Sequence, residues 1–166
     1  MPTKPANVQL LAATDAHFAW MLQQALAPEP HALRLPPQGV DSTEILTLLR
    51  AAAADLRSKF SGGCWLIIVD QEVVGLISYK RPPDVSGVTE IGFGVAQSRR
   101  GQGYATAAIR AVVQLAGNDP RVRSMTAETT LNNHASQAAL EAAGFLQAGL
   151  RTDADDGELA TWVRAL

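Results

Sequence analysis

Hydrophobic and polar residues alternate along this chain with two periods, and each period indicates one kind of element. In the stretch 43–60 the large aliphatic residues recur at helical spacing, which predicts an amphipathic helix. Solid apolar runs of strand length, such as CWLIIVD at 64–70, are bounded by turn residues. The pattern predicts helices at about 14–27, 43–60, 105–117 and 133–144. It predicts strands at 8–11, 64–70, 73–80, 88–96, 122–128, 145–150 and 158–166.

The segments between these elements are rich in turn residues. Four prolines interrupt the stretch 27–39, which favours a surface loop. The pair Gln71–Glu72 is predicted to turn the second strand into the third, and the acidic segment 151–157 to turn the last two strands. The element order β-α-α-β-β-β-α-β-α-β-β indicates an α/β (α+β) chain. No linker is long enough to divide it, so we expect a single domain over residues 1–166.

Composition and charge narrow the class of protein. Hydrophobic residues make up 47% and charged residues 18% of the 166 residues, which is typical of a folded chain. The net charge of -2 argues against a nucleic-acid partner, because such partners favour a basic surface. No apolar run approaches the ~18 residues of a membrane span. The N-terminus lacks the apolar core of a leader peptide, so we expect a cytoplasmic protein without a membrane partner.

Residues suited to disulfide or metal chemistry are few. Cys64 is the single cysteine, so it has no partner for an internal disulfide bond. Its place at the start of an apolar run favours a small buried hydrophobe over a nucleophile. No histidine, aspartate and glutamate cluster has metal-ligand spacing, and we predict no metal site.

The stretch QSRRGQGYAT, residues 97–106, combines two arginines with two glycines directly before a helix. A helix N-terminus presents unpaired N–H groups and a positive dipole end, both of which attract anions. Gly101 and Gly103 let a phosphate approach the backbone without meeting a Cβ atom. The loop therefore predicts a diphosphate site, in which the amides from Arg100 to Ala105 donate hydrogen bonds and Arg99 or Arg100 reaches a phosphate.

Three other interpretations of this loop remain to be weighed. It is not a P-loop, because no Gly-Lys-Ser/Thr follows the glycines. A dinucleotide fingerprint of an NAD-dependent oxidoreductase nearly fits, with Glu128 as the ribose-binding acid, but Thr106 replaces the third glycine. The hairpin-rich segment before the loop also differs from the parallel series that such a site needs. The third interpretation is a plain tight turn with solvated arginines.

Two motifs at the right separation carry a resemblance to a known family. Arg100-x-x-Gly103-x-Ala105 resembles the acyl-CoA pyrophosphate signature of the GNAT superfamily of N-acyltransferases. About thirty residues later, NHASQAALEAAGF resembles the second family motif, an Asn-x-x-Ser helix that closes in Gly-Phe. The element order is also similar to that fold from end to end. The segment 89–110 and the second motif look most like the branch that acetylates ribosomal-protein N-termini (RimJ/RimL-like).

The resemblance implies a mixed central sheet that is splayed open between the fourth and fifth strands and flanked by four helices. The pantetheine of acetyl-CoA would lie in that gap, and the diphosphate would lie on the loop. The implied contacts with acetyl-CoA are Phe93, Val95, Ala96, Arg99, Arg100, Gly101, Gln102, Gly103, Tyr104, Ala105, Thr106, Asn133 and Ser136.

In this family an amine attacks the thioester directly, so the protein must remove a proton and stabilise an oxyanion. The N–H of Val95 or of a neighbour is the implied oxyanion donor. Glu90 is the first candidate for the general base, acting through water, because glycines at 92 and 94 share its face of the strand. The alternative for Glu90 is an exposed glutamate in a salt bridge. Glu128 is the second candidate, and its alternative is a solvated charge at a strand end.

The second motif contributes two polar residues. The resemblance implies that Asn133 contacts the pantetheine arm and that the Ser136 hydroxyl group hydrogen-bonds the departing sulfur. Asn133 is equally suited to cap the helix that follows it. Many members use a tyrosine as the general acid here, but the only tyrosines of this chain are Tyr79 and Tyr104, which leaves the acid unassigned. His134 is expected to face solvent.

The sequence therefore predicts an N-acetyltransferase that uses acetyl-CoA and a primary amine. A protein or peptide N-terminus is the first candidate for the acceptor, and a small amine is the second. The acids of the segment 151–158 either steer a cationic amine or form a solvated turn. The alternative from another class is a non-catalytic module that binds acyl-CoA. The sequence leaves the oligomeric state open, although homodimers are frequent among the proteins that it resembles.

Overall fold

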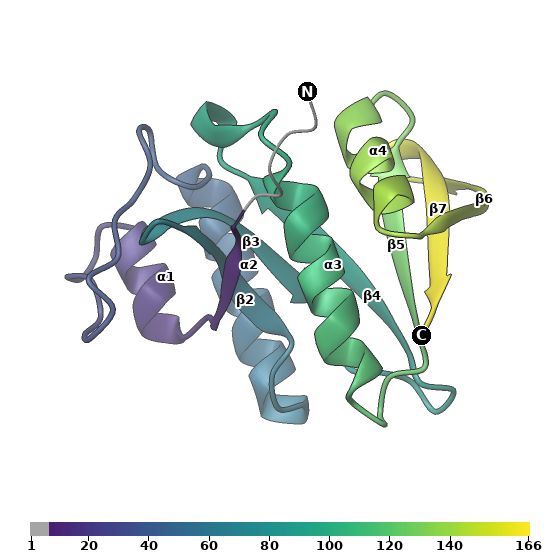
Figure 1. Cartoon of the computed structure of the whole chain (residues 1–166), viewed down its shortest axis with the longest axis horizontal. Coiled ribbons are helices and arrows are strands. Elements are labelled where there is room, and N and C mark those ends of the chain that lie inside the picture. The colour runs from purple at the N-terminus through teal and green to yellow at the C-terminus, as the bar shows by residue number, and fades with distance from the viewer. Residues whose placement is uncertain (1–6) are drawn as a thin grey trace.

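The computed structural model describes residues 7–166, and the first six residues, on which part of the leader-peptide expectation rests, lie outside the described part. Its centre is one seven-stranded sheet in the order β1-β2-β3-β4-β5-β7-β6 (Figure 1). The strands are β1 (Gln9–Ala12), β2 (Cys64–Val69), β3 (Glu72–Tyr79), β4 (Val88–Val95), β5 (Ser124–Thr130), β6 (Leu146–Asp153) and β7 (Gly157–Ala165). All neighbouring pairs are antiparallel except β4 and β5, which are parallel.

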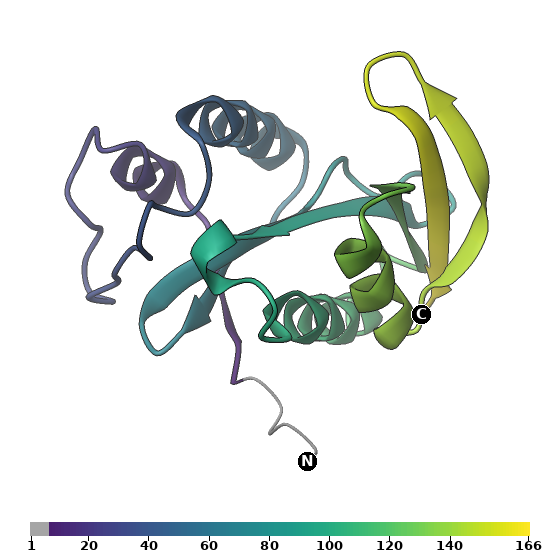
Figure 2. The same ribbon diagram turned by 90° about the horizontal axis from the view of Figure 1, so that it is seen from above.

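Four α-helices cover the two faces of this sheet in the described part of the chain. They are α1 (Asp15–Met21), α2 (Thr43–Lys59), α3 (Tyr104–Gly117) and α4 (His134–Ala142). Figure 2 shows α1 and α2 on one face, α3 and α4 on the other, and the β6–β7 hairpin curling toward the α2 face. The mixed, splayed α/β sheet with four flanking helices is the predicted fold, and it is confirmed.

The apolar stripes of the helices explain these two layers. On α3, Ala108, Ile109 and Val112 are fully buried and pack on the sheet in one core cluster. On the other face Leu46 and Ala53 of α2 belong to a second cluster. Because a helix buries only one stripe, each face of the sheet needs its own helix pair.

Cys64 begins β2 and is partly buried. Burial raises the pKa of its thiol to about 11, since a thiolate is poorly solvated there. This agrees with the expectation of a packing residue rather than a nucleophile.

The first helix is shorter than predicted. It ends at Met21, not near Ala27, because Gln23 adopts a positive φ of 61°. The N–H of Gln24 donates to the Ala19 carbonyl group, and that of Gln23 donates to the Trp20 carbonyl group. This pair of bonds is a Schellman motif, which usually carries glycine where Gln23 lies.

Three strand boundaries also differ from the prediction. The β2–β3 turn lies at Asp70–Gln71, where φ is positive at both residues, so Glu72 is in β3 and not in the turn. β5 continues to Thr130, which places Glu128 inside the strand and not at its end. β6 continues to Asp153 and leaves a shorter acidic turn.

Candidate functional site

The two halves of the sheet part along the β4–β5 boundary. The strands pair only over three residues, with Glu90 opposite Thr126 as the last pair. β4 nevertheless continues along β3 as far as Val95. The edge of β4 beyond Glu90 is therefore open toward β5, which is where the family resemblance implied a gap for pantetheine.

Phe93 and Val95 of β4 direct backbone groups into this gap, as the hydrogen bonds of the alternate residues show. The Glu90 carbonyl group accepts from Lys80 N–H (2.7 Å), and Ala96 N–H donates to the Val74 carbonyl group (2.8 Å), so these residues bond to β3 and its continuation. Alternate residues of a strand direct their polar backbone groups to opposite neighbours. Phe93 and Val95 consequently point theirs toward β5, and the strand edge is a template for an extended ligand.

The loop after β4 ends at the N-terminus of α3. A short 3₁₀ turn, Gln97–Arg99, leads into Gly101 and Gly103, whose φ angles are 78° and 80°. Gly103 is the N-cap of the 14-residue helix and offers no side-chain cap. A Cβ atom added at either glycine would meet no protein atom within 4 Å. The loop thus exposes backbone N–H groups beside open space, as an anion site requires.

The two arginines of this loop have different surroundings. Arg99 forms a bidentate ion pair with Glu72 of β3, through Nε at 2.5 Å and Nη2 at 3.1 Å. The Arg99 guanidinium group accordingly lowers the pKa of Glu72. Arg100 is exposed and donates from Nε to the Val95 carbonyl group at 3.1 Å. Arg100 is the better placed of the two for a phosphate, whereas Arg99 fixes the loop to the sheet.

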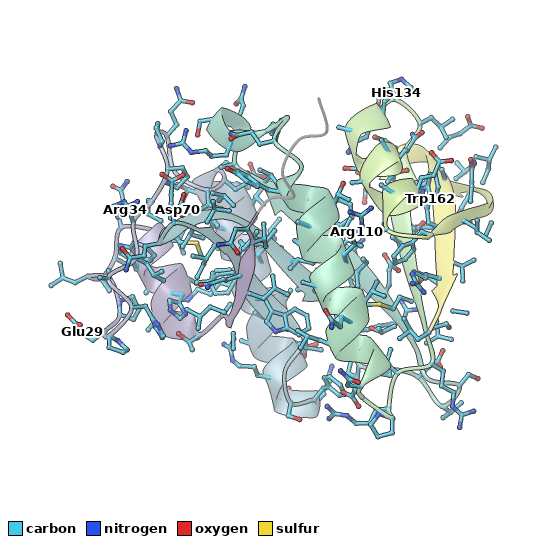
Figure 3. All side chains as sticks on the ribbon, in the orientation of Figure 1. Glu29, Arg34, Asp70, Arg110, His134 and Trp162 are labelled. Carbon is cyan, nitrogen blue, oxygen red and sulfur yellow. The ribbon has the colours of Figure 1, made fainter. Side chains whose placement is uncertain are left out.

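Sequence reasoning did not identify Glu72 as the partner of Arg99, nor the contacts that the segment 34–37 makes with the loop 97–106 and with the β2–β3 turn. The Ser98 hydroxyl group donates to the Pro37 carbonyl group, at 3.1 Å. Arg34 lies beside Asp70 in Figure 3 and donates to its carbonyl group at 2.8 Å. These contacts link residues 27 to 61 positions apart in the chain, so only the tertiary fold brings them together.

The second motif lies across the gap, at the start of α4. Asn133 is the N-cap and accepts from Ser136 N–H at 3.2 Å, which is the capping role considered for it. Within residues 7–166 the Ser136 hydroxyl group makes no hydrogen bond, so it is available to a ligand. Figure 3 shows His134 at the outer end of α4, and it is exposed as expected.

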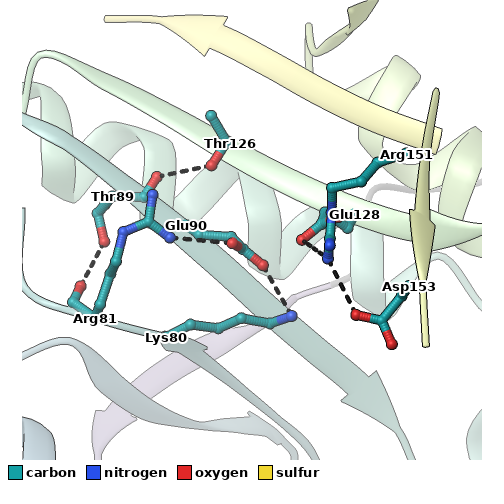
Figure 4. Close-up of polar contacts among 8 residues, drawn as sticks. All are labelled: Lys80, Arg81, Thr89, Glu90, Thr126, Glu128, Arg151 and Asp153. Carbon is teal, nitrogen blue, oxygen red and sulfur yellow. Dashed lines mark hydrogen bonds and ion pairs between the residues drawn. The ribbon is translucent and has the colours of Figure 1, made fainter. Parts of the chain in front are cut away.

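Glu90 lies on the α2 face of β4 and is held between two cations. Its carboxylate oxygens contact Lys80 Nζ at 2.9 Å and Arg81 Nη1 at 3.0 Å (Figure 4). The Glu90 side chain is only 13% exposed. The salt bridge considered for Glu90 is therefore present, and a water molecule would have to reach a carboxylate that already has partners.

Glu128 occupies the neighbouring strand on the same side of the sheet (Figure 4). Arg151 of β6 binds it in a bidentate manner, through Nε at 2.6 Å and Nη2 at 3.1 Å. Arg151 also contacts Asp153 at 3.4 Å. The N–H groups of Asp155 and Asp156 donate to Asp153 and lower its pKa. Asp153 thus stabilises the β6–β7 turn through these two hydrogen bonds.

Two further properties concern only residues 7–166. No three histidine, cysteine, aspartate or glutamate side chains there are grouped to hold a metal ion. None of the helices in the same range has both the length and the hydropathy that a membrane span requires.

Comparisons with known proteins agree with this geometry. Residues 7–146 match the sequence model of a family described as "Acetyltransferase (GNAT) domain". A protein of Bacillus subtilis (strain 168) named "Uncharacterized N-acetyltransferase YjdG" is 33% identical over 84 residues, or 49% of this chain and 50% of that protein. The match therefore spans about half the length of that curated relative.

Solved structures share the fold at low sequence identity. The RimL ribosomal L7/L12 α-N-protein acetyltransferase in complex with coenzyme A superposes with a TM-score of 0.74 at 19% identity, over 99% of this chain and 97% of that chain. The aminoglycoside acetyltransferase AAC(6')-Ib in complex with coenzyme A superposes with a TM-score of 0.70 at 20% identity, over 96% and 95%. The Salmonella typhimurium enzyme that modifies the N-terminal serine of L7/L12 gives 0.73 at 18%, over 96% and 95%.

Proposed function

This chain belongs to the GNAT acetyltransferase family, and from that premise we propose that it transfers an acetyl group from acetyl-CoA to a primary amine. The observation that carries the proposal is the loop 97–106, which places Gly103 at the N-cap of α3 beside the open edge of β4. Backbone N–H groups there are oriented for a diphosphate. The backbone groups of Phe93 and the N–H of Val95 face the gap and suit the amide-bearing pantetheine arm, while the Val95 carbonyl group accepts from Arg100.

In the proposed reaction the amine nitrogen attacks the thioester carbonyl carbon. A C–N bond forms, the C–S bond breaks, the nitrogen loses a proton, and the departing sulfur gains one. We assign the N–H of Val95 as the donor to the developing oxyanion, because it faces the gap. The Ser136 hydroxyl group, on the opposite side of the gap, would donate to the sulfur.

The proton acceptor is one of two carboxylates. Glu90 is our first choice, acting through water, because it is the last β4 residue paired with β5 and lies next to the glycine face of the strand. Glu128 is the second choice. Arg151 contacts both carboxylate oxygens of Glu128, as Lys80 and Arg81 together do for Glu90, so the preference for Glu90 rests on its place at the β4–β5 boundary.

For the acceptor we propose a protein or peptide N-terminus first and a small amine second. Support comes from the likeness to the RimL ribosomal L7/L12 α-N-protein acetyltransferase and to the Salmonella typhimurium enzyme that modifies the N-terminal serine of L7/L12. The aminoglycoside enzyme of comparable similarity keeps the small amine as an alternative.

One observation favours a non-catalytic acyl-CoA-binding module as a second candidate. Both carboxylates that the reaction could use, Glu90 and Glu128, are ion-paired within the protein. A binding module needs the loop and the β4 edge but no free base, so only turnover separates the two functions.

The test combines binding with turnover. Acetyl-CoA, CoA and NAD are titrated calorimetrically, and thiol release is then followed with a panel of peptide and small amines. Transfer to any amine supports the enzyme, whereas acetyl-CoA binding without turnover supports the binding module. Tight binding of NAD in place of acetyl-CoA would refute both.

Glu90→Gln is the informative variant, with the exposed Glu141→Gln on α4 as its control. Loss of a general base lowers kcat by about 100-fold or more, while the Kd of acetyl-CoA stays unchanged. Equal activity of the two variants would move the base to Glu128.

A further inference from the structure

A cleft of about 270 Å³ lies between α2 and the strands β3 and β4, on the face opposite α3 and α4. Its walls are apolar and include Ile45, Leu49 and Ala52 of α2 and Leu76 of β3. Asp41 and Lys80 are the charged residues in its lining. The excess of apolar residues on α2 was visible in the sequence, but the register that leaves a hollow beside them was not.

Glycines of β4 form the floor of this cleft. A Cβ atom at Gly94 would meet nothing within 4 Å, so the hollow is open there. A Cβ atom at Gly92 would contact the Lys80 stem at 3.1 Å. Both glycines lie beyond Glu90, where β4 has left β5. The cleft therefore opens onto the same segment of β4 that borders the gap.

The charges around the cleft disfavour a polycationic acceptor. A molecule with several ammonium groups needs several free carboxylates, but Lys80 and Arg81 already neutralise Glu90. Arg151 likewise neutralises Glu128. Within the cleft the one lining acid is Asp41, whose carboxylate accepts from Ser42 N–H at 2.7 Å, so the lining offers a single carboxylate. A ligand with several ammonium groups would have to break the internal pairs of Glu90 and Glu128 for the others.

Size and polarity favour a single apolar group. Pockets for drug-sized ligands occupy about 300–1,000 Å³, and this cleft is below that range. Its exposed apolar wall includes Ile45, which is 40% exposed despite its size. Burial of an apolar side chain there removes apolar surface from water on both partners.

We propose that this cleft binds the apolar side chain of the acceptor's first residue, so that the substrate class is a peptide N-terminus that begins with a large apolar residue. The inference rests on the proposed acetyl transfer and specifies its acceptor. A polycationic amine is the competing class.

The experiment compares peptides that differ only in the first residue, leucine or glycine, with kanamycin and spermidine as polycationic acceptors. Acetyl-CoA binding is measured on the same protein by calorimetry. We expect kcat/KM to be at least about 10-fold higher for the leucine peptide than for the glycine peptide, within the range that hydrophobic pockets achieve. Kanamycin and spermidine should be poorer acceptors than the leucine peptide.

Two α2 residues that are three positions apart provide a matched pair of variants. Ile45→Asp places a charge in the cleft, whereas Leu48→Asp changes a residue that is 62% exposed and outside the lining. Ile45→Asp should remove the preference for leucine over glycine, and Leu48→Asp should keep it. The Kd of acetyl-CoA should be unchanged in both.

Three outcomes would overturn the inference. Preferred transfer to kanamycin or spermidine would refute it while the proposed function stands. An equal effect of Ile45→Asp and Leu48→Asp would show that the cleft does not select the acceptor. No binding of acetyl-CoA would refute the proposed function and this inference with it.

Discussion

At the scale of single residues, the two arginines of the phosphate loop should differ in what they do. Arg100→Ala should raise the Kd of acetyl-CoA about 10-fold, because a charge-assisted hydrogen bond contributes about 1.5–3 kcal/mol. Arg99→Ala should act mainly on stability, since Arg99 is bound to Glu72. Calorimetric Kd values and thermal midpoints for both variants test this difference.

Glu72→Gln is the control for Arg99. If the ion pair is what Arg99 contributes, the double variant should lose no more stability than either single variant. A 10-fold loss of acetyl-CoA affinity in Arg99→Ala, with Glu72→Gln normal, would instead assign Arg99 to a phosphate.

His17 should make folding stability sensitive to mild acid. It is 5% exposed, its Nδ1 accepts from Thr14 N–H at 3.0 Å, and burial lowers its pKa. The folded protein therefore keeps His17 neutral at pH values where the unfolded chain binds a proton. Stability is fully present above about pH 6.5 and falls as the pH drops below it, by about 1.4 kcal/mol per pH unit until the folded-state pKa is reached.

His17→Gln removes this titration but keeps a side-chain acceptor for Thr14 N–H. Thermal melts of both proteins from roughly pH 5 to pH 8 bracket the ordinary histidine pKa. The variant should show the shallower decline on the acid side. Parallel curves would mean that His17 binds protons equally in the folded and unfolded states.

The sequence identified several of these residues but not their partners. Glu90 could be chosen because two glycines follow it at period two, yet the contacts with Lys80 and Arg81 depend on how β3 and β4 are paired. The Glu72–Arg99 pair joins residues 27 positions apart. Side-chain partners of this kind are set by strand register, which a single sequence does not specify.

At the scale of elements, the turn into α3 should depend on glycine for two separate reasons. Gly103→Ala forces a residue with a Cβ atom to hold φ at 80°, which costs about 1–2 kcal/mol. It also puts a methyl group into the space through which a phosphate approaches the backbone. We expect the thermal midpoint to fall by a few degrees and the Kd of acetyl-CoA to rise at least about 10-fold.

Gly157→Ala separates the two effects. Gly157 has a φ of 75°, and its added Cβ atom also meets nothing within 4 Å, but it is the first residue of β7, directly after the β6–β7 turn. It should lose similar stability and no affinity. Equal affinity losses in the two variants would show that backbone strain, not access to the loop, governs binding.

Elements were predicted well where the apolar pattern extends over several turns. Their ends were misplaced where a single residue takes an unusual backbone conformation. α2 and α3 agree with the pattern because their apolar stripes run over several turns. α1 stops early because Gln23 closes a Schellman motif without glycine, and Asp70–Gln71 forms a hairpin turn without glycine. Positive φ at such residues leaves no compositional signal.

At the scale of the whole molecule, the gap between β4 and β5 was predicted from the family resemblance and not from the hydrophobic pattern. Periodicity marks β4 and β5 as strands, but it does not reveal that they pair only from Val88 to Glu90. That short pairing and the packing of α3 against α4 both help to join the two halves of the sheet. A ligand that lies along the gap would contact both halves at once.

Hydrogen exchange should report that contact directly. Binding of acetyl-CoA at saturating concentration stabilises the folded state by mass action, and it should protect specific amides beyond that global effect. We expect slower exchange at Phe93 and Val95, whose N–H groups face the gap, and in the loop 100–106. The even-numbered residues of β4 already bond to β3, so their exchange should change less.

The turn 154–156 is the internal control, because it lies far along the β6–β7 hairpin (Figure 2). Slower exchange in the loop alone would support the diphosphate site but contradict the placement of pantetheine along the β4 edge. It would also contradict the assignment of Val95 N–H as the donor to the oxyanion.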